Sequence, residues 1–312
     1  MGFFLFLFKL LALVVGGALL ITLSLSLING KNTATSSNLI SPLAQTQTQE
    51  VQSENVANYL NPGMKLAIDQ ALEGTTGTYA IYFKKLKTGE TYAQNENLRF
   101  QSASLYKLLL MATAFRLMHD DKLDENELLR KDAADLNRIF DIASESAELK
   151  EGEVSMTVKD AIEKSIVISH NYAALLLSNR VKISTMRLFL KNEGFSSSNV
   201  GQPPQTTALD IASFYEKLYN GTLVNKEYSD RMLAILKGQQ LNDRIPKYLP
   251  EEVLIAHKTG ELQGFKHDAG IVFSPDADYI LVILSESNNP KMAAERIAQV
   301  SKAVYSYLQK SK

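Results

Sequence analysis

The sequence predicts an α+β fold: an antiparallel five-stranded sheet built from both ends of the domain and flanked by helices, with an all-helical insertion subdomain beside it. Three observations support this prediction. Strand-like segments occur near both ends of the folded part, and mostly helical sequence fills the middle. The 312 residues are 45% hydrophobic and 21% charged. A chain of this length and composition can bury one large core or two modest ones.

The first part of the domain is expected to form a helix and a hairpin. A Pro-Gly start signal precedes a helix over Met64–Leu72. The segment Thr78–Leu86 is rich in residues that favour strands, and Glu90–Ala93 continues as a second strand after the turn at residues 87–89. The next segment, Leu105–Met118, is apolar around nearly the whole helix, which indicates burial.

The end of the domain returns to strands after mostly helical sequence up to about Gln240. Three short segments are typical of strands: Val253–His257, Gly270–Phe273 and Tyr279–Ser285. An amphipathic helix over Lys291–Leu308 closes the domain. We therefore place the early hairpin and the three late strands in one antiparallel sheet.

The N-terminus indicates export. The only charge in residues 2–28 is Lys9, and the uninterrupted apolar run from Leu10 to Ile28 is 19 residues long. About 20 apolar residues span a bilayer as a helix, whereas the apolar region of a cleaved signal peptide is usually shorter. We predict a signal anchor or transmembrane helix over 1–28, with a cleaved signal as the alternative. Either way the domain is expected outside the cytoplasm.

A polar segment separates this anchor from the folded domain. Residues 29–57 are rich in Asn, Ser, Thr and Gln and lack helical periodicity, which predicts a flexible linker. The domain itself is expected over 58–312. Its sheet part takes residues of about 58–100 and 251–312, and its helical part takes those of about 101–250.

The charge balance and the absence of cysteine exclude several classes of function. Lys and Arg together number 33 against 34 Asp and Glu, which gives a net charge of −1. A nucleic-acid binder needs a basic excess or a basic stripe, so no nucleic-acid partner is expected. With no cysteine, the chain has no disulfide, no thiol nucleophile, no cysteine-ligated metal centre and no lipid-modified cysteine.

The buried helix expected over Leu105–Met118 carries an unusual lysine, Lys107. Burial lowers the pKa of a lysine and suits it to general-base catalysis. Ser104 precedes Lys107 by three residues, so both side chains lie on one helix face. Backbone N–H groups at the helix start would stabilise an anion there. The alternative is an N-cap serine followed by a lysine that extends to the surface.

Two further motifs follow along the chain. Ser-His-Asn at 169–171 precedes the apolar helix YAALLL, and its alternative interpretation is an N-cap serine with a polar neighbour. Lys-Thr-Gly at 258–260 stands at the end of a predicted strand, where the alternative is a turn. The ordered set Ser-x-x-Lys, Ser-x-Asn and Lys-Thr-Gly is far more specific than any single member.

With these motifs the sequence resembles the serine penicillin-recognising enzymes, and most closely the class A β-lactamase family of the β-lactamase and DD-peptidase superfamily. RFQSASLYKLLLMATAF is similar to the family's Arg-Phe-x-x-x-Ser-x-x-Lys segment. SHNYAALLL resembles its Ser-Asp-Asn-x-Ala-Ala-x-Leu-Leu segment, and TTALDIA its Thr-Thr-Pro-x-x-Met-Ala segment. The resemblance covers about residues 60–312, with the order of the elements intact.

The resemblance implies a catalytic set of five residues. Ser104 is the nucleophile that becomes acylated, and Lys107 assists its deprotonation. Ser169 relays a proton toward the leaving nitrogen, while Asn171 orients Lys107 and the substrate amide. Lys258 holds Ser169 and the substrate carboxylate in a positive field.

The resemblance also implies that Thr259, Gly260 and Glu261 bind the substrate. Thr259 binds the substrate carboxylate, and the backbone N–H groups of Ser104 and Glu261 form the oxyanion hole. The substrates are β-lactams or the acyl-D-Ala-D-Ala stem peptides of peptidoglycan. No metal or cofactor is implied, and a monomer at the bacterial cell envelope is expected.

The sequence departs from the family at three places. His170 replaces the Asp of the second motif. The interval that corresponds to the family's Ω-loop is only Ser196–Gln205, and it lacks the glutamate that deacylates class A enzymes; Glu193 and Glu216 lie outside it. The strand after Lys-Thr-Gly carries Lys266 where many class A enzymes place an arginine.

Three functions remain open on these grounds. The first is a class A-like β-lactam hydrolase with a different route for the deacylating water. The second is a membrane-anchored DD-peptidase or transpeptidase, which the anchor and the missing acid favour. The third is a penicillin-binding sensor that stays acylated. Because the local sequence is closest to class A, we predict a β-lactamase-like serine hydrolase that acts through an acyl-enzyme on Ser104.

Overall fold

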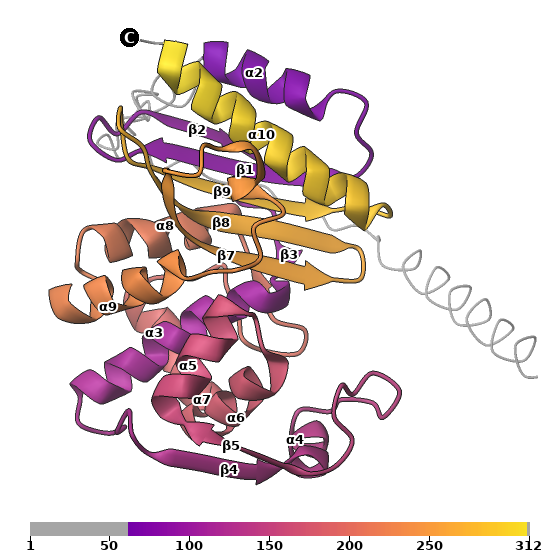
Figure 1. The fold of residues 1–312 in the computed structure, drawn as a ribbon, viewed down its shortest axis with the longest axis vertical. Helices are drawn as coiled ribbons and strands as arrows, with labels where there is room; N and C mark the ends of the chain where they lie inside the picture. Colours follow the sequence, from indigo (N-terminus) through magenta and orange to yellow (C-terminus); the bar gives the residue numbers. More distant parts are fainter. Residues whose placement is uncertain (1–61, 311–312) are drawn as a thin grey trace, which may run out of the picture. The chain divides into compact units, whose positions relative to one another are not determined.

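The computed structural model describes residues 62–310. The anchor predicted over 1–28 and the linker predicted over 29–57 lie outside these residues. Within the described part, no helix is both long enough and apolar enough to cross a membrane. The described residues form a central sheet with helices on both of its faces and a largely helical region beside it (Figure 1).

The central sheet confirms the prediction that both ends of the domain contribute strands. Its order is β2-β1-β9-β8-β7, and every neighbouring pair is antiparallel. β1 and β9, the first and last strands of the chain's described part, pair directly along their whole length. The five strands are β1 (Thr78–Lys85), β2 (Thr91–Gln94), β7 (Leu254–Leu262), β8 (Phe265–Phe273) and β9 (Tyr279–Glu286).

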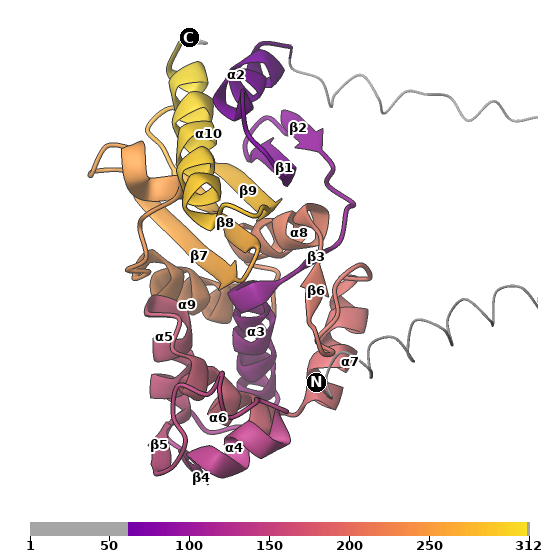
Figure 2. The same ribbon diagram turned by 90° about the vertical axis from the view of Figure 1, so that its right-hand side faces the viewer.

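Two helices cover one face of the sheet, as Figures 1 and 2 show. They are α2 (Pro62–Leu72) and α10 (Pro290–Lys310). Helix α10 buries Ile297, Val300 and Val304, which recur at helical spacing on the side that faces the sheet. The two helices predicted at the ends of the domain are thus confirmed.

The larger core surrounds α3 (Tyr106–His119), the helix that the sequence predicts to be buried. Its residues from Lys107 to Phe115 are all buried, as expected of a helix enclosed on every side. Helix α8 packs on the sheet through β1 and β9, and α9 lies against β7. The helices other than α2, α3 and α10 are α4 (Ala133–Ile139), α5 (Val158–Val167), α6 (Asn171–Val181), α7 (Ile183–Glu193), α8 (Ala208–Tyr219) and α9 (Lys226–Lys237).

The middle of the chain also contains strands, so the prediction of an all-helical insertion is wrong in this respect. β3 (Phe100–Gln101) pairs with β6 (Gln205–Thr206), and β4 (Leu128–Asp132) pairs with β5 (Glu153–Thr157). Strands of two residues leave no periodicity in a sequence, and β4 carries three charged residues in the run LLRKD. A search for alternating hydrophobicity therefore misses both pairs.

The late strands are longer than the sequence predicts. β7 continues to Leu262, so the Lys-Thr-Gly motif lies inside the strand rather than at its end. β8 begins at Phe265 rather than at Gly270. Both extensions carry polar side chains that are nevertheless buried, among them His267 and Asp268. A hydropathy pattern ends where such residues begin, although the backbone pairing continues.

Candidate active site

Three segments that are distant in sequence meet at one end of α3. They are the start of α3 itself, the turn before α6, and strand β7. The Nζ atom of Lys107 lies 2.8 Å from Oδ1 of Asn171 and 3.3 Å from Oγ of Ser169. The Nζ atom of Lys258 lies 2.9 Å from the same Oγ of Ser169. The structure thus brings together one residue or more from each of the three motifs.

Lys107 is fully buried at the first turn of α3, so the alternative of a lysine that extends to the surface is wrong. Its Nζ donates to the carbonyl oxygen of Ser169 at 2.7 Å and to Oδ1 of Asn171 at 2.8 Å. Burial lowers the pKa of Lys107 to about 7, although the negative charge of Glu148 opposes part of this shift. Lys107 is therefore able to accept and return a proton near neutral pH.

Ser169 adopts a left-handed backbone conformation, with φ of 56°. A non-glycine residue in this region is strained, and such strain is concentrated at functional sites. Its hydroxyl accepts hydrogen bonds from two lysines instead of capping a helix. The N-cap of α6 is His170, whose Nδ1 accepts the backbone N–H of Ala173 at 3.1 Å. The N-cap alternative for Ser169 is thus wrong, and His170 fills a capping position that an Asp would also suit.

Lys258 is buried in the middle of β7, and its Nζ also donates to the carbonyl oxygen of Thr259 at 2.8 Å. Burial and the nearby charge of Lys107 hold the pKa of Lys258 well below its ordinary value, against the opposing charge of Asp268. Two ammonium groups on one hydroxyl repel each other. Protonation of one lysine therefore disfavours protonation of the other, and the two titrate as a pair.

Ser104 lies in the 3-10 helix η1 (Ala103–Leu105), directly before α3 and one turn from Lys107. It is half-buried, and it is not an N-cap: those positions belong to Ser102 for η1 and Leu105 for α3, and neither makes a side-chain cap. Helix η1 packs against β7. The N-cap alternative for Ser104 is wrong, and its hydroxyl is left available for chemistry.

Gly260 allows β7 to approach the segment ahead of Ser104 closely. A Cβ atom at this position would lie 3.1 Å from the carbonyl oxygen of Ser102 and 3.0 Å from Cδ2 of His267. Most pairs of non-bonded carbon and oxygen atoms stay farther apart than this. The glycine of the motif therefore sets the distance between the segment ahead of Ser104 and β7.

His267 holds the chain just before Ser104 through a hydrogen bond, a role that the sequence did not indicate. Its Nε2 donates to the carbonyl oxygen of Gln101 at 2.8 Å, and its Nδ1 accepts the backbone N–H of Ser285 at 3.1 Å. Burial lowers the pKa of His267 to about 4, so the ring is neutral at ordinary pH and holds this tautomer. It joins β8, β9 and the chain just before Ser104.

A buried arginine, Arg244, supplies positive charge beside β7. Its side chain is 2% exposed, and Nη2 donates to Glu261 at 2.6 Å, while Nε and Nη1 have no hydrogen-bond partner. Lys266 pairs with the other oxygen of Glu261. The sequence pointed to Lys266 alone, because Arg244 precedes β7 instead of following it. The positive charge of Arg244 also lowers the pKa of Lys258, although burial and the charge of Lys107 have larger effects. The charge of Arg244 therefore acts on the candidate active site.

The interval Ser196–Gln205, which corresponds to the family's Ω-loop, contains no acidic residue. Of the two nearby glutamates, Glu193 ends α7 and pairs with Lys217 at 2.9 Å and Arg116 at 3.4 Å. Glu216 lies on α8 and pairs with Lys84. Both carboxylates are held by structural ion pairs. Among residues 62–310, no group of three or more acidic, histidine or cysteine side chains is arranged to hold a metal ion.

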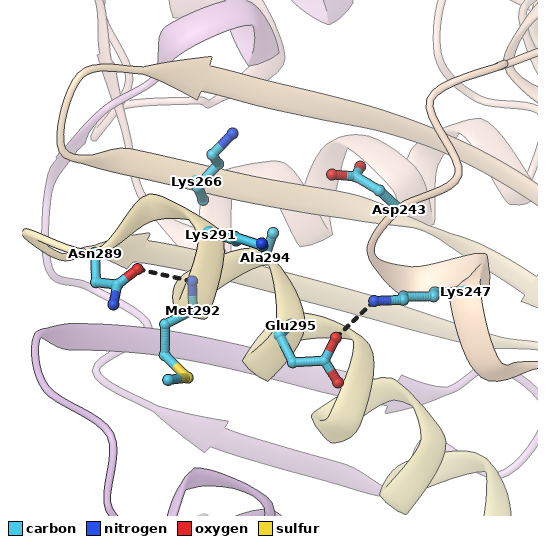
Figure 3. A pocket seen from close by; sticks show the side chains of 8 residues that line it. All are labelled: Asp243, Lys247, Lys266, Asn289, Lys291, Met292, Ala294 and Glu295. Carbon is cyan, nitrogen blue, oxygen red and sulfur yellow. Dashed lines mark hydrogen bonds and ion pairs between the residues drawn. The ribbon is translucent and has the colours of Figure 1, made fainter.

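Lys266 is one of the residues that line a pocket in this part of the molecule. Figure 3 shows its lining, in which Lys247 pairs with Glu295 at 2.6 Å and Asn289 Oδ1 accepts the backbone N–H of Met292 at 3.0 Å. None of the residues proposed for catalysis lines it. The residues that line this pocket are Asp243, Lys247, Lys266, Asn289, Lys291, Met292, Ala294 and Glu295.

Comparisons with known proteins agree with this geometry. The model of a family described as the Beta-lactamase enzyme family matches residues 64–308. A solved β-lactamase from Sphaerobacter thermophilus is 26% identical with a TM-score of 0.70, and the match covers 79% of this chain and 97% of that one. No curated protein matches this chain significantly.

Two more distant structures show the same fold. PBP-A is 24% identical with a TM-score of 0.72, over 80% of this chain and 97% of its own. A class A β-lactamase from Bacteroides cellulosilyticus is 20% identical with a TM-score of 0.68, over 80% of this chain and 98% of its own. At these identities the likeness concerns the fold alone.

Proposed function

The chain belongs to the Beta-lactamase enzyme family, and from that premise we propose that it opens the amide bond of β-lactams through an acyl-enzyme on Ser104. One observation carries the proposal. Two buried lysines, Lys107 and Lys258, both contact the hydroxyl of Ser169 at one end of the helix that follows Ser104. This arrangement supplies a base, a proton relay and a cation within one small region.

The acylation step uses the lowered pKa of Lys107, about 7. Neutral Lys107 accepts the proton of the Ser104 hydroxyl as Oγ attacks the lactam carbonyl carbon. The ring C–N bond then breaks as Ser169 gives its proton to the nitrogen, and the lysine ammonium returns a proton to Ser169. The proton thus passes from Ser104 to the leaving nitrogen with no net change in the lysines.

Substrate binding is proposed for residues along β7. The backbone N–H groups of Ser104 and Glu261 form the oxyanion hole, and losing one such donor costs about 3–4 kcal/mol of transition-state stabilisation. The Thr259 hydroxyl and the Lys258 ammonium bind the carboxylate of the substrate. Arg244, two of whose guanidinium nitrogens make no hydrogen bond, adds positive charge on that side.

The shortened Ω-loop interval favours a second candidate function. Hydrolysis of the acyl-enzyme needs a base that takes a proton from the attacking water, and the interval Ser196–Gln205 offers none. A membrane-anchored DD-peptidase or transpeptidase of peptidoglycan stem peptides would share the acylation machinery and turn over penicillin slowly. A variant of PBP-A, which has this fold, is described as an acyl-enzyme complex with penicillin G.

Intact-protein mass spectrometry distinguishes the two functions. The domain from residue 57 onward is mixed with benzylpenicillin and sampled over time. An adduct that forms and clears while penicilloic acid accumulates supports the hydrolase, and an adduct that persists supports the peptidase. Ser104→Ala should form no adduct. Ser102→Ala is the matched control, because Ser102 lies two residues away and its hydroxyl makes only a 3.4 Å contact to Ala103; an adduct lost in both variants would contradict the assignment.

The location of the enzyme is a separate proposal. Residues 1–28 would hold the domain, as a monomer, on the outer side of the cytoplasmic membrane, where β-lactams and stem peptides are met. Cell fractionation of the full chain against a chain without residues 1–28 tests this. Recovery of both forms in the cytoplasm would contradict it.

A further inference from the structure

A buried pair of side chains, His257 on β7 and Asp268 on β8, has no part in the proposed chemistry. Nδ1 of His257 lies 2.9 Å from Oδ1 of Asp268, and the two side chains are 2% and 0% exposed. The register of the two strands places Gly270 directly opposite His257. A Cβ atom at this glycine would lie 2.6 Å from Cβ of His257, so a larger residue there would displace the histidine.

The pair holds the chain on both sides of Arg244. Oδ2 of Asp268 accepts the backbone N–H of Ile245, the residue after Arg244, at 2.9 Å. Nε2 of His257 lies 3.1 Å from Oδ1 of Asn242, two residues before Arg244. Because Asp268 is fully buried, the loss of either of its partners would leave a carboxylate oxygen unsatisfied away from water, which is costly. These contacts therefore fix the path of the chain at Arg244.

The same contacts bring Arg244 close to Thr259. Alternate residues of a strand point to one face of a sheet, so Thr259 shares its face with His257 and Glu261. The register places Asp268 opposite Thr259, and side chains of directly opposed residues lie on the same face. The chain around Arg244 contacts all three of these neighbours. It therefore crosses the face of the sheet at Thr259, the residue proposed to bind the substrate carboxylate.

We propose that the His257–Asp268 pair positions Arg244 for recognition of the substrate carboxylate. This inference rests on the proposed function, in which Thr259 and Lys258 bind that carboxylate and Arg244 adds positive charge. His257 and Asp268 are positioning residues, which act through Arg244 and touch no substrate atom. Loss of the pair would free the chain at Arg244 and weaken recognition of the carboxylate, while the serine nucleophile and its base stay in place.

Two substrates that differ only in the carboxylate measure this recognition. Benzylpenicillin carries the carboxylate, and its methyl ester has the same rings and side chain without the negative charge. The second-order rate of Ser104 acylation is measured for each by quenched mass spectrometry on the full chain. The ratio of the acid rate to the ester rate reports carboxylate recognition. A general loss of stability lowers both rates together and leaves this ratio unchanged.

His257→Ala removes both contacts of the ring. We substitute His257 instead of Asp268, because the negative charge of Asp268 opposes the burial that lowers the pKa of Lys258, and its removal would alter a second group of the site. His257→Ala should lower the acid-to-ester ratio about tenfold, as expected when a charge-assisted hydrogen bond is lost. His257→Asn can still donate to Asp268 from the position of Nδ1, so it should recover the ratio to within about threefold.

Two further variants make the test independent of how well His257→Ala folds. Asn242→Ala removes the partner of Nε2 from an exposed position, and it should lower the ratio about threefold. Tyr215→Phe is the matched control, because the buried Tyr215 hydroxyl donates to the carbonyl oxygen of Ala269, one residue from Asp268, at 2.8 Å. This hydrogen bond does not involve the chain around Arg244, so the control should keep the ratio within about 1.5-fold.

A double substitution tests whether His257 acts through Arg244. Arg244→Gln should itself lower the ratio about tenfold, since it removes the charge of the guanidinium. His257→Ala added to Arg244→Gln should lower the ratio no further, because the effects of residues that act as one unit do not add. A further fall in the double variant would show that His257 acts through another group, and the inference would be wrong.

The remaining outcomes separate this inference from the function on which it rests. If Ser104 is acylated and the ratio is unchanged in His257→Ala and Asn242→Ala, the inference is wrong while the proposed function stands. If His257→Ala does not fold, the ratio in Asn242→Ala decides alone. An equal fall in Tyr215→Phe also overturns the inference, because the loss of any buried hydrogen bond on β8 would then suffice. If benzylpenicillin does not acylate Ser104, the proposed function fails and this inference fails with it.

Discussion

The pH dependence of acylation follows from the burial of Lys107. Lys107 must be neutral to take the proton of Ser104, and burial lowers its pKa from 10.5 to about 7. The groups that face it are Lys258, whose charge disfavours a second ammonium, and Glu148, whose charge favours one. Burial lowers the pKa of His170, so its ring is neutral over a wider pH range than a free imidazole.

The sign and the size of the effect can be worked out from this value. About half of Lys107 is neutral at pH 7, about one tenth at pH 6 and about one hundredth at pH 5. The acylation rate should therefore rise about tenfold per pH unit up to pH 6, and level off above pH 8. A lysine with its ordinary pKa of 10.5 would instead let the rate rise through pH 9.

Single-turnover acylation by benzylpenicillin, quenched with acid and counted by mass spectrometry, measures this profile between pH 5 and pH 9. Lys107→Arg keeps the positive charge but cannot deprotonate, so its rate should be about 10²–10⁴-fold lower than that of the unaltered protein on the plateau above pH 8 and should not rise with pH. Glu148→Gln should move the midpoint to lower pH, because the carboxylate that favours the ammonium is gone. A flat profile, or one still rising at pH 9, would refute the assignment of Lys107 as the base.

Substitutions at three other residues test substrate binding, stability and the spacing of η1 from β7. Arg244→Lys loses the planar guanidinium beside Glu261, and the penicillin concentration for half-maximal acylation rate should rise about tenfold or more; an unchanged value would exclude Arg244 from substrate binding. Tyr172→Phe removes a buried hydroxyl that donates to Oδ1 of Asn137 at 2.7 Å, and it should lower the free energy of unfolding by about 1–3 kcal/mol in urea titrations, whereas an unchanged midpoint would show that this hydrogen bond is dispensable. Gly260→Ala should slow acylation about tenfold or more, because the added methyl group separates η1 from β7; a rate within twofold would contradict this.

The motifs in the sequence predicted which residues would meet, and the structure places several of them in contact. Lys107 stood out because a charge in an otherwise apolar helix is costly unless it has a function or a partner. Ser169 and Lys258 stood out only through the order and spacing of three motifs. The early hairpin and the three late strands could be placed in one antiparallel sheet because strand-like segments occur near both ends of the folded part, and the central sheet confirms that placement.

The strand ends and the capping residues could not be predicted from the same sequence. Because His267 and Asp268 are polar, the hydropathy pattern places them outside a strand, yet both are fully buried in β8. Their burial depends on partners such as the Gln101 carbonyl, more than 100 residues away in the chain. Hydropathy describes a residue alone, whereas burial of a polar group is decided by whether the fold supplies its hydrogen bonds.

By itself, the sequence determined the class of fold, the buried helix with its lysine and the missing Ω-loop acid, since these depend on residue type and local order. Only the tertiary structure decided that Arg244 approaches Glu261 and that Glu148 contacts Asn171. Each contact joins a loop residue to a residue of a strand or helix, and the spacing between the two partners along the chain carries no periodic signal. The physical cause of both contacts is the packing of elements that brings these residues to one place, and packing is a property of the whole chain.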